Sequence, residues 1–126
     1  MVVLDTSALI YWTMDPDRLT AEAQTTIEQT DQLVISSMSI WEIGLKLKYK
    51  RLEIPLTIET YARRLQMTEK VVIREVDVQT WIENLALDWD HRDPADRTIV
   101  ATARLLGCGL VSSDRRIAGF FKETIW

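Results

Sequence analysis

The chain begins with the stretch MVVLDTSAL (residues 1–9), and this stretch indicates the kind of fold. Its apolar run, Val2–Leu4, ends abruptly at Asp5, which is typical of a short strand buried on both faces. Comparable runs recur along the chain, at residues 33–36, 71–73 and 110–112, with a short fifth run near residues 124–125. We therefore expect a sheet of four or five strands.

Segments with a helical pattern separate these runs. They are expected at residues 19–30, from Ser37 or Ser39 to about residue 51, and at residues 58–66, 78–87 and 93–106. The last is the best marked, because Asp93-Pro94 opens it and Gly107 follows it. Buried strands that alternate with helices predict an α/β fold with three layers, α/β/α, around a mainly parallel sheet. Because the sequence contains no repeat or linker, residues 1–126 are expected to form a single domain.

The composition is that of an ordinary globular protein. A hydrophobic fraction of 47% and a charged fraction of 27% argue against intrinsic disorder. No apolar run approaches the roughly 18 residues that would span a membrane, and the first residues lack the basic leader of a signal peptide. The single Cys108 can form no internal disulfide, so we expect a cytoplasmic protein.

The net charge is −4, from 15 Lys and Arg against 19 Asp and Glu. Taken alone, it argues against a nucleic-acid-binding protein, whose binding surface is normally basic. The argument weakens if several carboxylates converge to hold divalent ions, because the charge of the ions then reverses the local field. The positions of the acidic residues therefore decide the question.

Asp5 and Asp114 each follow a predicted strand. In open parallel sheets, active sites lie outside the carboxyl ends of the strands, near the point where the strand order reverses. If the first and fourth strands are neighbours, these two carboxylates lie at the same edge of the sheet. The alternative is that each aspartate merely caps a helix, or that Asp114 pairs with Arg115 and Arg116.

Glu42 lies within a predicted helix. Its simplest interpretation is a surface ion pair with Lys46, one helical turn away. However, Trp41, Leu45 and Tyr49 form a second apolar stripe beside it, and a helix that is apolar on two sides is expected to be enclosed. Glu42 is therefore expected to do more than face solvent.

Asp93 and Asp96 open the best-marked helix, where acidic residues favour the helix N-terminus. Capping accounts fully for Asp93. It accounts less well for Asp96, which shares a helical face with the apolar Ile99 and Ala103, while Arg97 is expected on the opposite, outer side. An acidic side chain on the inward face, close to the helix start, is suited to a metal-binding cleft.

Several carboxylates without a cluster of Cys or His favour Mg²⁺ or Mn²⁺ over zinc. Such ions bind phosphate oxygens, lower the pKa of a bound water and stabilise charge on a leaving oxygen. Hydrolysis of a phosphodiester then needs no histidine base, and the only histidine, His91, is expected to be structural or to contact substrate. Hydroxyls such as that of Ser112 are expected to support the ligands by hydrogen bonds.

Four motifs resemble those of the PIN-domain family, and within it the VapC-type toxins of bacterial toxin–antitoxin pairs. They are VLDTSAL at residues 3–9, SIWEI at residues 39–43, HRDPADR at residues 91–97 and LVSSD at residues 110–114. Each motif is weak alone, but in this order and spacing the set is specific and covers essentially the whole chain. The sequence departs from the commoner pattern at Ala95, often aromatic, and at Ser112, often threonine, and neither position supplies a metal ligand.

The resemblance implies a Mg²⁺- or Mn²⁺-dependent endoribonuclease toxin that cuts tRNA, rRNA or mRNA. Its catalytic and metal-binding residues form an acidic quartet, consisting of Asp5, Glu42, Asp96 and Asp114. Three further residues match positions that support the quartet, namely Thr6, Asp93 and Ser112. The resemblance also implies a homodimer and a cognate antitoxin whose tail covers the active site.

RNA is expected to contact basic residues around the acidic cleft. The candidates are Lys46, Arg92, Arg97 and Arg115, and the arginines are favoured because guanidinium groups match phosphate geometry. The alternative for these residues is an ordinary solvated surface. Two other functions stay open, which are a PIN-type RNA-processing nuclease without an antitoxin and a catalytically silent binding module.

Overall fold

The computed structural model describes all 126 residues and contains one parallel sheet of five strands in the order β3-β2-β1-β4-β5. The strands are β1 (Val2–Leu4), β2 (Leu33–Ser36), β3 (Val71–Arg74), β4 (Gly109–Val111) and β5 (Thr124–Ile125). All four pairings are parallel, and Val3 of β1 lies between Val34 of β2 and Leu110 of β4. The predicted α/β fold with a parallel sheet is confirmed.

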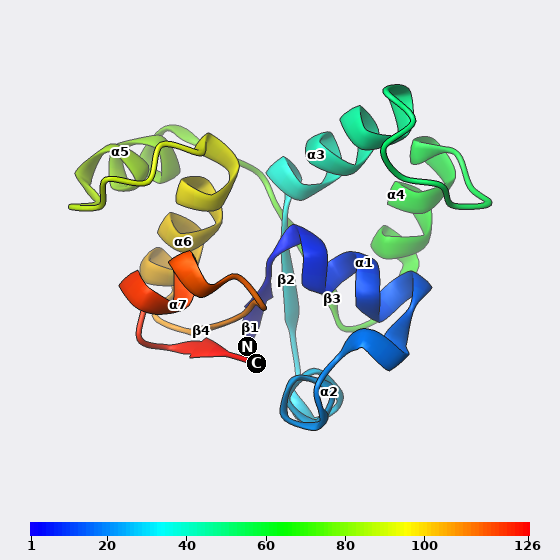
Figure 1. The fold of residues 1–126 in the computed structure, drawn as a ribbon, viewed down its shortest axis with the longest axis horizontal. Coiled ribbons are helices and arrows are strands. Elements are labelled where there is room, and N and C mark those ends of the chain that lie inside the picture. Colours follow the sequence, from blue (N-terminus) through cyan, green and yellow to red (C-terminus); the bar gives the residue numbers. More distant parts are fainter.

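Helices cover both faces of this sheet (Figure 1). They are α1 (Thr6–Met14), α2 (Ala21–Gln29), α3 (Ser37–Lys48), α4 (Ile58–Met67), α5 (Val78–Ala86), α6 (Pro94–Leu106) and α7 (Arg115–Phe120), with a 3₁₀ turn at Pro16–Arg18. The first four α-helices lie on one side of the sheet, and α5, α6 and α7 lie on the other. The molecule therefore has the three layers that the sequence predicts.

Two apolar cores separate these layers. Alternate residues of β1 divide between them: Leu4 packs with Leu9 and Ile27 on the side of α1 and α2. Val3 packs with Ile99 and Ile117 on the side of α6 and α7. Burying each such side chain contributes about 1.5–3 kcal/mol, which is why the strands read as unbroken apolar runs.

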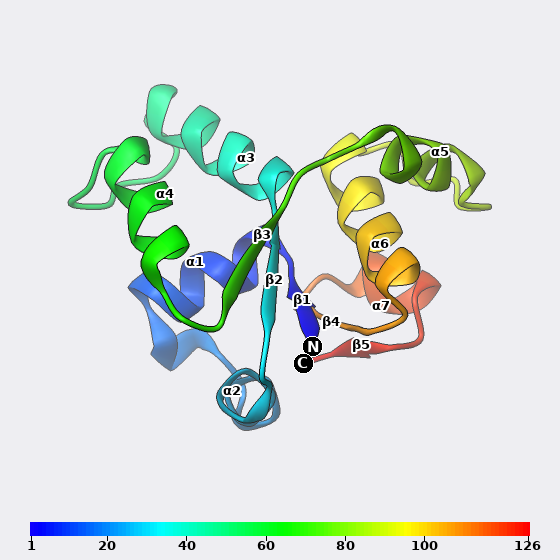
Figure 2. The ribbon, with the colours of Figure 1, turned by 180° about the vertical axis from the view of Figure 1, so that it is seen from behind.

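The strand order reverses at β1, which lies between β2 and β4. The carboxyl ends of these three strands meet at one edge of the sheet, and α3 and α6 begin beside that edge (Figure 1). Figure 2 shows the chain leaving β3 and crossing this edge to reach α5 on the other face. The predicted neighbour relation between the first and fourth strands is therefore confirmed.

Some local details differ from the expectations. The helices α1 and α7 were not expected as segments, and only their capping residues, Asp5 and Asp114, mark them in the sequence. The cap of α3 is Ser36, not Ser37 or Ser39. Gly107 ends α6 as predicted, in a left-handed conformation with φ of 62°. No helix is long and apolar enough to cross a membrane.

The expectation that α3 is enclosed on two sides is wrong. Trp41 is 59% exposed and Tyr49 is 63% exposed, so the stripe that they form with Leu45 faces outward. Only the other face of α3 is buried, through Ser39 and Ile43. The outward stripe lines a groove beside Glu42.

Candidate active site

Asp5 follows β1 directly and is only 5% exposed. Its Oδ1 accepts a hydrogen bond from the backbone N–H of Ala8 at 2.7 Å, which caps α1. Its Oδ2 accepts a short hydrogen bond from the hydroxyl of Ser112, at the end of β4. The pKa of Asp5 is raised to about 6, mainly by burial and also by the nearby charges of Asp96 and Asp114. The two hydrogen bonds lower this pKa but do not cancel the effect of burial.

Glu42 reaches the same region from α3. The hydroxyl of Thr6 donates to its Oε1 at 2.5 Å and also lies 2.9 Å from the hydroxyl of Ser39. Burial raises the pKa of Glu42, and the negative charges of Asp93 and Asp96 act in the same direction. Lys46 is close enough to lower this pKa, but the two side chains form no ion pair. The surface ion pair is therefore not formed.

Asp96 lies in the first turn of α6. Its backbone N–H donates to Oδ1 of Asp93 at 3.0 Å, so Asp93 caps the helix as predicted. The Nε2 atom of His91 lies 2.7 Å from Oδ2 of Asp96. Burial raises the pKa of Asp96, and the charges of Asp93 and Asp114 raise it further.

Asp114 follows β4 and caps α7. Its Oδ1 accepts hydrogen bonds from the backbone N–H groups of Arg116, at 2.8 Å, and Ile117, at 3.4 Å. Its own N–H donates to the hydroxyl of Ser112 at 3.0 Å. The side chains of Arg115 and Arg116 form no ion pair with it. Ser112 thus links Asp5 and Asp114 across the β1–β4 junction.

The structure brings the acidic quartet together at the carboxyl edge of the sheet. The charge of Asp114 affects the pKa values of Asp5 and Asp96, and the charge of Asp96 affects those of Asp5 and Glu42. Capping by Asp5 and Asp114 is real but does not compete with this convergence, because each uses Oδ1 for the cap. The second oxygen of Asp114 accepts no hydrogen bond from the protein, whereas that of Asp5 accepts one from Ser112.

The donor set of this cluster fits a hard divalent cation. No three carboxylates already surround a single point. Mg²⁺, however, usually keeps several waters and is held by one or two carboxylates directly. Three oxygens accept no hydrogen bond from the protein, and these are Oε2 of Glu42, Oδ1 of Asp96 and Oδ2 of Asp114. Asp5 is buried, Glu42 and Asp96 are partly buried, and all three carboxyls have raised pKa values, so a bound cation would offset the cost of their charge.

Arg97 has a different role from the one expected. Its guanidinium donates to the side chain of Asn84 and to four carbonyls, those of Asn84, Leu87, Trp89 and His91. Five N–H donors are all that an arginine carries. None is left for a phosphate, so the prediction that Arg97 contacts RNA is wrong. Lys46, Arg92 and Arg115 keep their side chains at least partly exposed.

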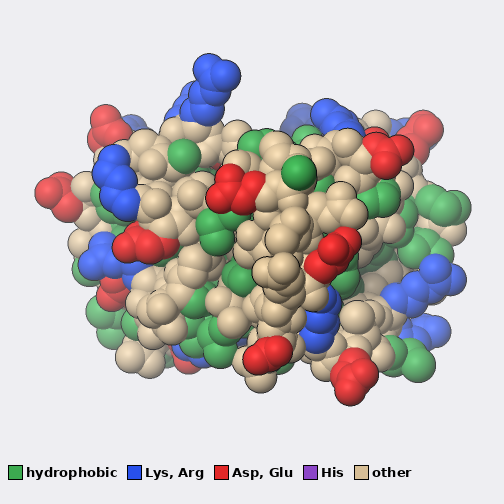
Figure 3. Space-filling model, turned by 90° about the horizontal axis from the view of Figure 1, so that it is seen from below, with side chains coloured by type: hydrophobic (Ala, Val, Ile, Leu, Met, Phe, Trp, Pro, Cys, Tyr) green, Lys and Arg blue, Asp and Glu red, His purple; other side chains and the backbone are tan.

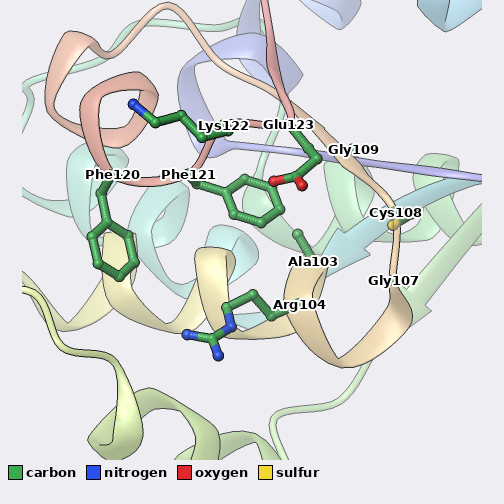
Figure 4. Close-up of a pocket in the computed structure, with 9 residues that line it drawn as sticks. All are labelled: Ala103, Arg104, Gly107, Cys108, Gly109, Phe120, Phe121, Lys122 and Glu123. Carbon is green, nitrogen blue, oxygen red and sulfur yellow. The ribbon is translucent and has the colours of Figure 1, made fainter.

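The largest pocket lies elsewhere. It has a volume of about 510 Å³ and is bounded by the end of α6, the start of β4 and residues 120–123 (Figure 4). Its charged lining is Arg104, Lys122 and Glu123, and no member of the acidic quartet reaches it. Seen from below, acidic and basic side chains are dispersed singly over the surface (Figure 3). The largest cavity is therefore separate from the acidic quartet.

Known proteins share this fold and sequence pattern. The model of the PIN domain family matches residues 2–122. Ribonuclease VapC22 of Mycobacterium tuberculosis is 29% identical over 116 residues, which cover 92% of this chain and 88% of that protein. A toxin–antitoxin complex from Klebsiella pneumoniae matches with a TM-score of 0.72 and 18% identity, over 100% of this chain and 97% of that one.

A second solved structure is VapC20 of M. tuberculosis, described as a sarcin-ricin loop cleaving toxin. It matches with a TM-score of 0.68 and 17% identity over 94% of each chain. These structural likenesses show the fold, and the family model spans nearly the whole sequence. The chain belongs to the PIN domain family.

Proposed function

We propose that this protein is a metal-dependent endoribonuclease toxin that an antitoxin neutralises. The observation that carries the proposal is the convergence of Asp5, Glu42, Asp96 and Asp114 at the point where the strand order reverses. The relatives support the choice of RNA, since VapC22 is named a ribonuclease and VapC20 is described as a toxin that cleaves the sarcin-ricin loop.

The quartet would hold Mg²⁺ or Mn²⁺, with Thr6 and Ser112 fixing two of the carboxylates. When bound, such an ion lowers the pKa of a water and stabilises charge on the leaving oxygen. Asp5 lies deepest, and its hydrogen bonds to Ala8 and Ser112 hold it without rotation. Glu42 and Asp96 approach from helices on opposite faces of the sheet, so a scissile phosphate would lie between them.

A groove beside Glu42 supports RNA binding. It has a volume of about 380 Å³, lies between α3 and the start of α6, and includes Trp41, Glu42, Lys46, Tyr49 and Arg51 in its lining. Cationic side chains can contact phosphates, and exposed aromatic rings can stack on bases. Arg92 and Arg115 are exposed next to Asp93 and Asp114 and would extend the phosphate contacts. RNA as substrate would place the activity in the cytoplasm.

The outer face of α5 supports a homodimer. Its inward side chains include the polar Thr80 and Asn84, which are buried. Its outward face is apolar at the spacing of one helical stripe, with Val78 72%, Ile82 62% and Leu85 81% exposed. A contiguous apolar face of this kind marks an interaction surface, and a second copy of the chain could cover it with the same face. Toxin–antitoxin complexes among the structural matches support an antitoxin as a further partner.

Cleavage of RNA by the wild type and by Asp5→Asn, each with Mg²⁺, Mn²⁺ or EDTA, tests the proposal. The exposed Asp31→Asn is a matched control that removes the same charge far from the cleft. We expect cleavage and growth arrest with the wild type and the control, and neither with Asp5→Asn. Cleavage that survives EDTA, or that Asp5→Asn retains, would refute the metal-carboxylate mechanism. Cleavage without growth arrest would instead favour an RNA-processing nuclease.

A further inference from the structure

His91 is the only histidine of the chain, and it lies against Asp96. Its Nε2 atom is 2.7 Å from Oδ2 of Asp96, and its side chain is only 12% exposed. An ionised carboxylate can only accept hydrogen bonds, so Nε2 carries the proton and donates it. The contact is therefore a directed hydrogen bond in a partly dry environment, where such bonds are strong.

Two sets of contacts fix the imidazole in place. Its ring packs on Trp89 with the ring centroids 4.8 Å apart, and Trp89 in turn stacks on Phe120 at 4.7 Å with nearly parallel planes. The backbone on either side is tied to α6, because Arg97 donates to the carbonyls of Trp89, at 2.6 Å, and His91, at 3.1 Å. Arg97 and Asp96 are adjacent in α6, so one helical turn holds both the loop and the carboxylate that the loop contacts.

The same pattern recurs at two other members of the acidic quartet. Thr6 donates to one oxygen of Glu42, and Ser112 donates to one oxygen of Asp5. Each donor restrains a carboxylate through a hydrogen bond from a side chain of another segment. His91 restrains Asp96 in the same way, by a hydrogen bond to Oδ2. The other oxygen of Asp96, Oδ1, accepts no hydrogen bond from the protein.

We propose that His91 is a positioning residue that holds Asp96 with Oδ1 turned toward the divalent cation. This inference rests on the proposed metal-dependent function. It gives the histidine no role as an acid or base and no direct contact with the cation. Partners of metal ligands commonly contribute 10–100-fold to metal affinity, because they fix the orientation of the ligand before the ion arrives.

Two variants separate the hydrogen bond from the packing of the ring. His91→Phe keeps an aromatic ring against Trp89 but has no donor. His91→Gln loses the ring but carries an amide N–H that can reach Asp96. A residue that only packs the loop would be replaced better by phenylalanine, whereas a positioning residue would be replaced better by glutamine.

The measurement is Mn²⁺ binding to each full-length protein without RNA, by titration calorimetry, together with thermal unfolding in EDTA. We expect His91→Phe to bind Mn²⁺ 10–100-fold more weakly than the wild type with little change in unfolding temperature. His91→Gln should bind within about threefold of the wild type. Raising the Mn²⁺ concentration should restore RNA cleavage by His91→Phe, with an unchanged KM for RNA.

Wild-type affinity in His91→Phe would overturn the inference and leave the proposed function intact. A loss of affinity that His91→Gln does not relieve would also overturn it, because the hydrogen bond would not be the cause. No binding of Mn²⁺ by the wild type would refute both the proposed function and the inference.

Discussion

Replacing Asp5 by asparagine should stabilise the metal-free protein while it abolishes cleavage. Asp5 is 5% exposed, and its burial raises its pKa from 3.8 to about 6. At pH 7.5 Asp5 is therefore ionised in the folded protein, although its charge is less favourable there than in the solvated unfolded chain. This difference in pKa corresponds to about 3 kcal/mol of lost stability. Asparagine is neutral, and its carbonyl oxygen can still accept from the N–H of Ala8.

The pH dependence has a definite sign. The folded protein binds the Asp5 proton more tightly than the unfolded chain does, so the stability contributed by this group is complete below pH 3.8 and is lost as the pH rises to about 6. This direction is opposite to that of a carboxylate in a salt bridge. The advantage of Asp5→Asn should therefore be largest above pH 6 and should shrink by about 2 kcal/mol between pH 7.5 and pH 4.5.

Thermal unfolding of the wild type and Asp5→Asn in EDTA tests this reasoning. At pH 7.5 we expect the variant to gain about 1–3 kcal/mol, or roughly 4–12 °C in Tm, since part of the gain is offset by a weaker contact with Ser112. Added Mn²⁺ should raise the Tm of the wild type and leave that of the variant unchanged. An equal or lower Tm for the variant at pH 7.5 would refute the argument that Asp5 is a desolvated charge.

Three other perturbations test separate parts of the molecule. Thr6→Val removes the donor to Glu42 with little change in shape, and kcat/KM for RNA should fall about 10–100-fold; unchanged kinetics would mean that Glu42 needs no support. Lys46→Gln should weaken the binding of RNA to a cleavage-dead protein, and it should reduce the slope of log K for binding against the log of the salt concentration by about 0.7. The control Lys122→Gln, remote from the groove beside Glu42, should change neither the affinity nor the slope. Equal effects of the two lysines would exclude a groove-specific contact. Ile82→Asp, on the exposed face of α5, should yield a monomer in sedimentation equilibrium, and an unchanged mass would refute α5 as the dimer interface.

The three central strands β1, β2 and β4 could be predicted because burial leaves a short apolar run, and this signal is local. The edge strand β3 is only partly buried, but its run of β-branched residues, Val71–Ile73, carries the same local signal. The helix α1 left no such signal. Its sequence, Thr6–Met14, has an unbroken apolar run at residues 8–12 that covers all sides of a helix, so it shows no helical period, and only Asp5 marks its start. Where periodicity and capping both operate, as in α6, the boundaries were also correct.

The closeness of the four carboxylates could be predicted in part, because strand ends and helical faces place them at one edge of the sheet, whereas the choice of these four as a metal-binding set came from the family resemblance. The errors concern contacts between distant segments. Helical spacing alone predicts that Arg97 faces solvent. In the structure, the segment from Asn84 to His91 folds over that side of α6 and accepts hydrogen bonds from all five N–H groups of the Arg97 side chain. Trp41 was expected to be enclosed, but no other segment of the chain covers it.

The way in which the quartet is held explains how a protein with a net charge of −4 can act on a polyanion. Neither Asp5, Glu42 nor Asp114 pairs with a lysine or arginine, although basic residues lie nearby in the sequence. Their restraints are hydroxyls and backbone N–H groups, which fix geometry without cancelling charge. Internal ion pairs would satisfy the carboxylates and remove their attraction for a cation. Under the proposed function, this uncompensated charge would be available to a cationic ligand, either divalent ions during cleavage or a basic side chain of an inhibitory partner.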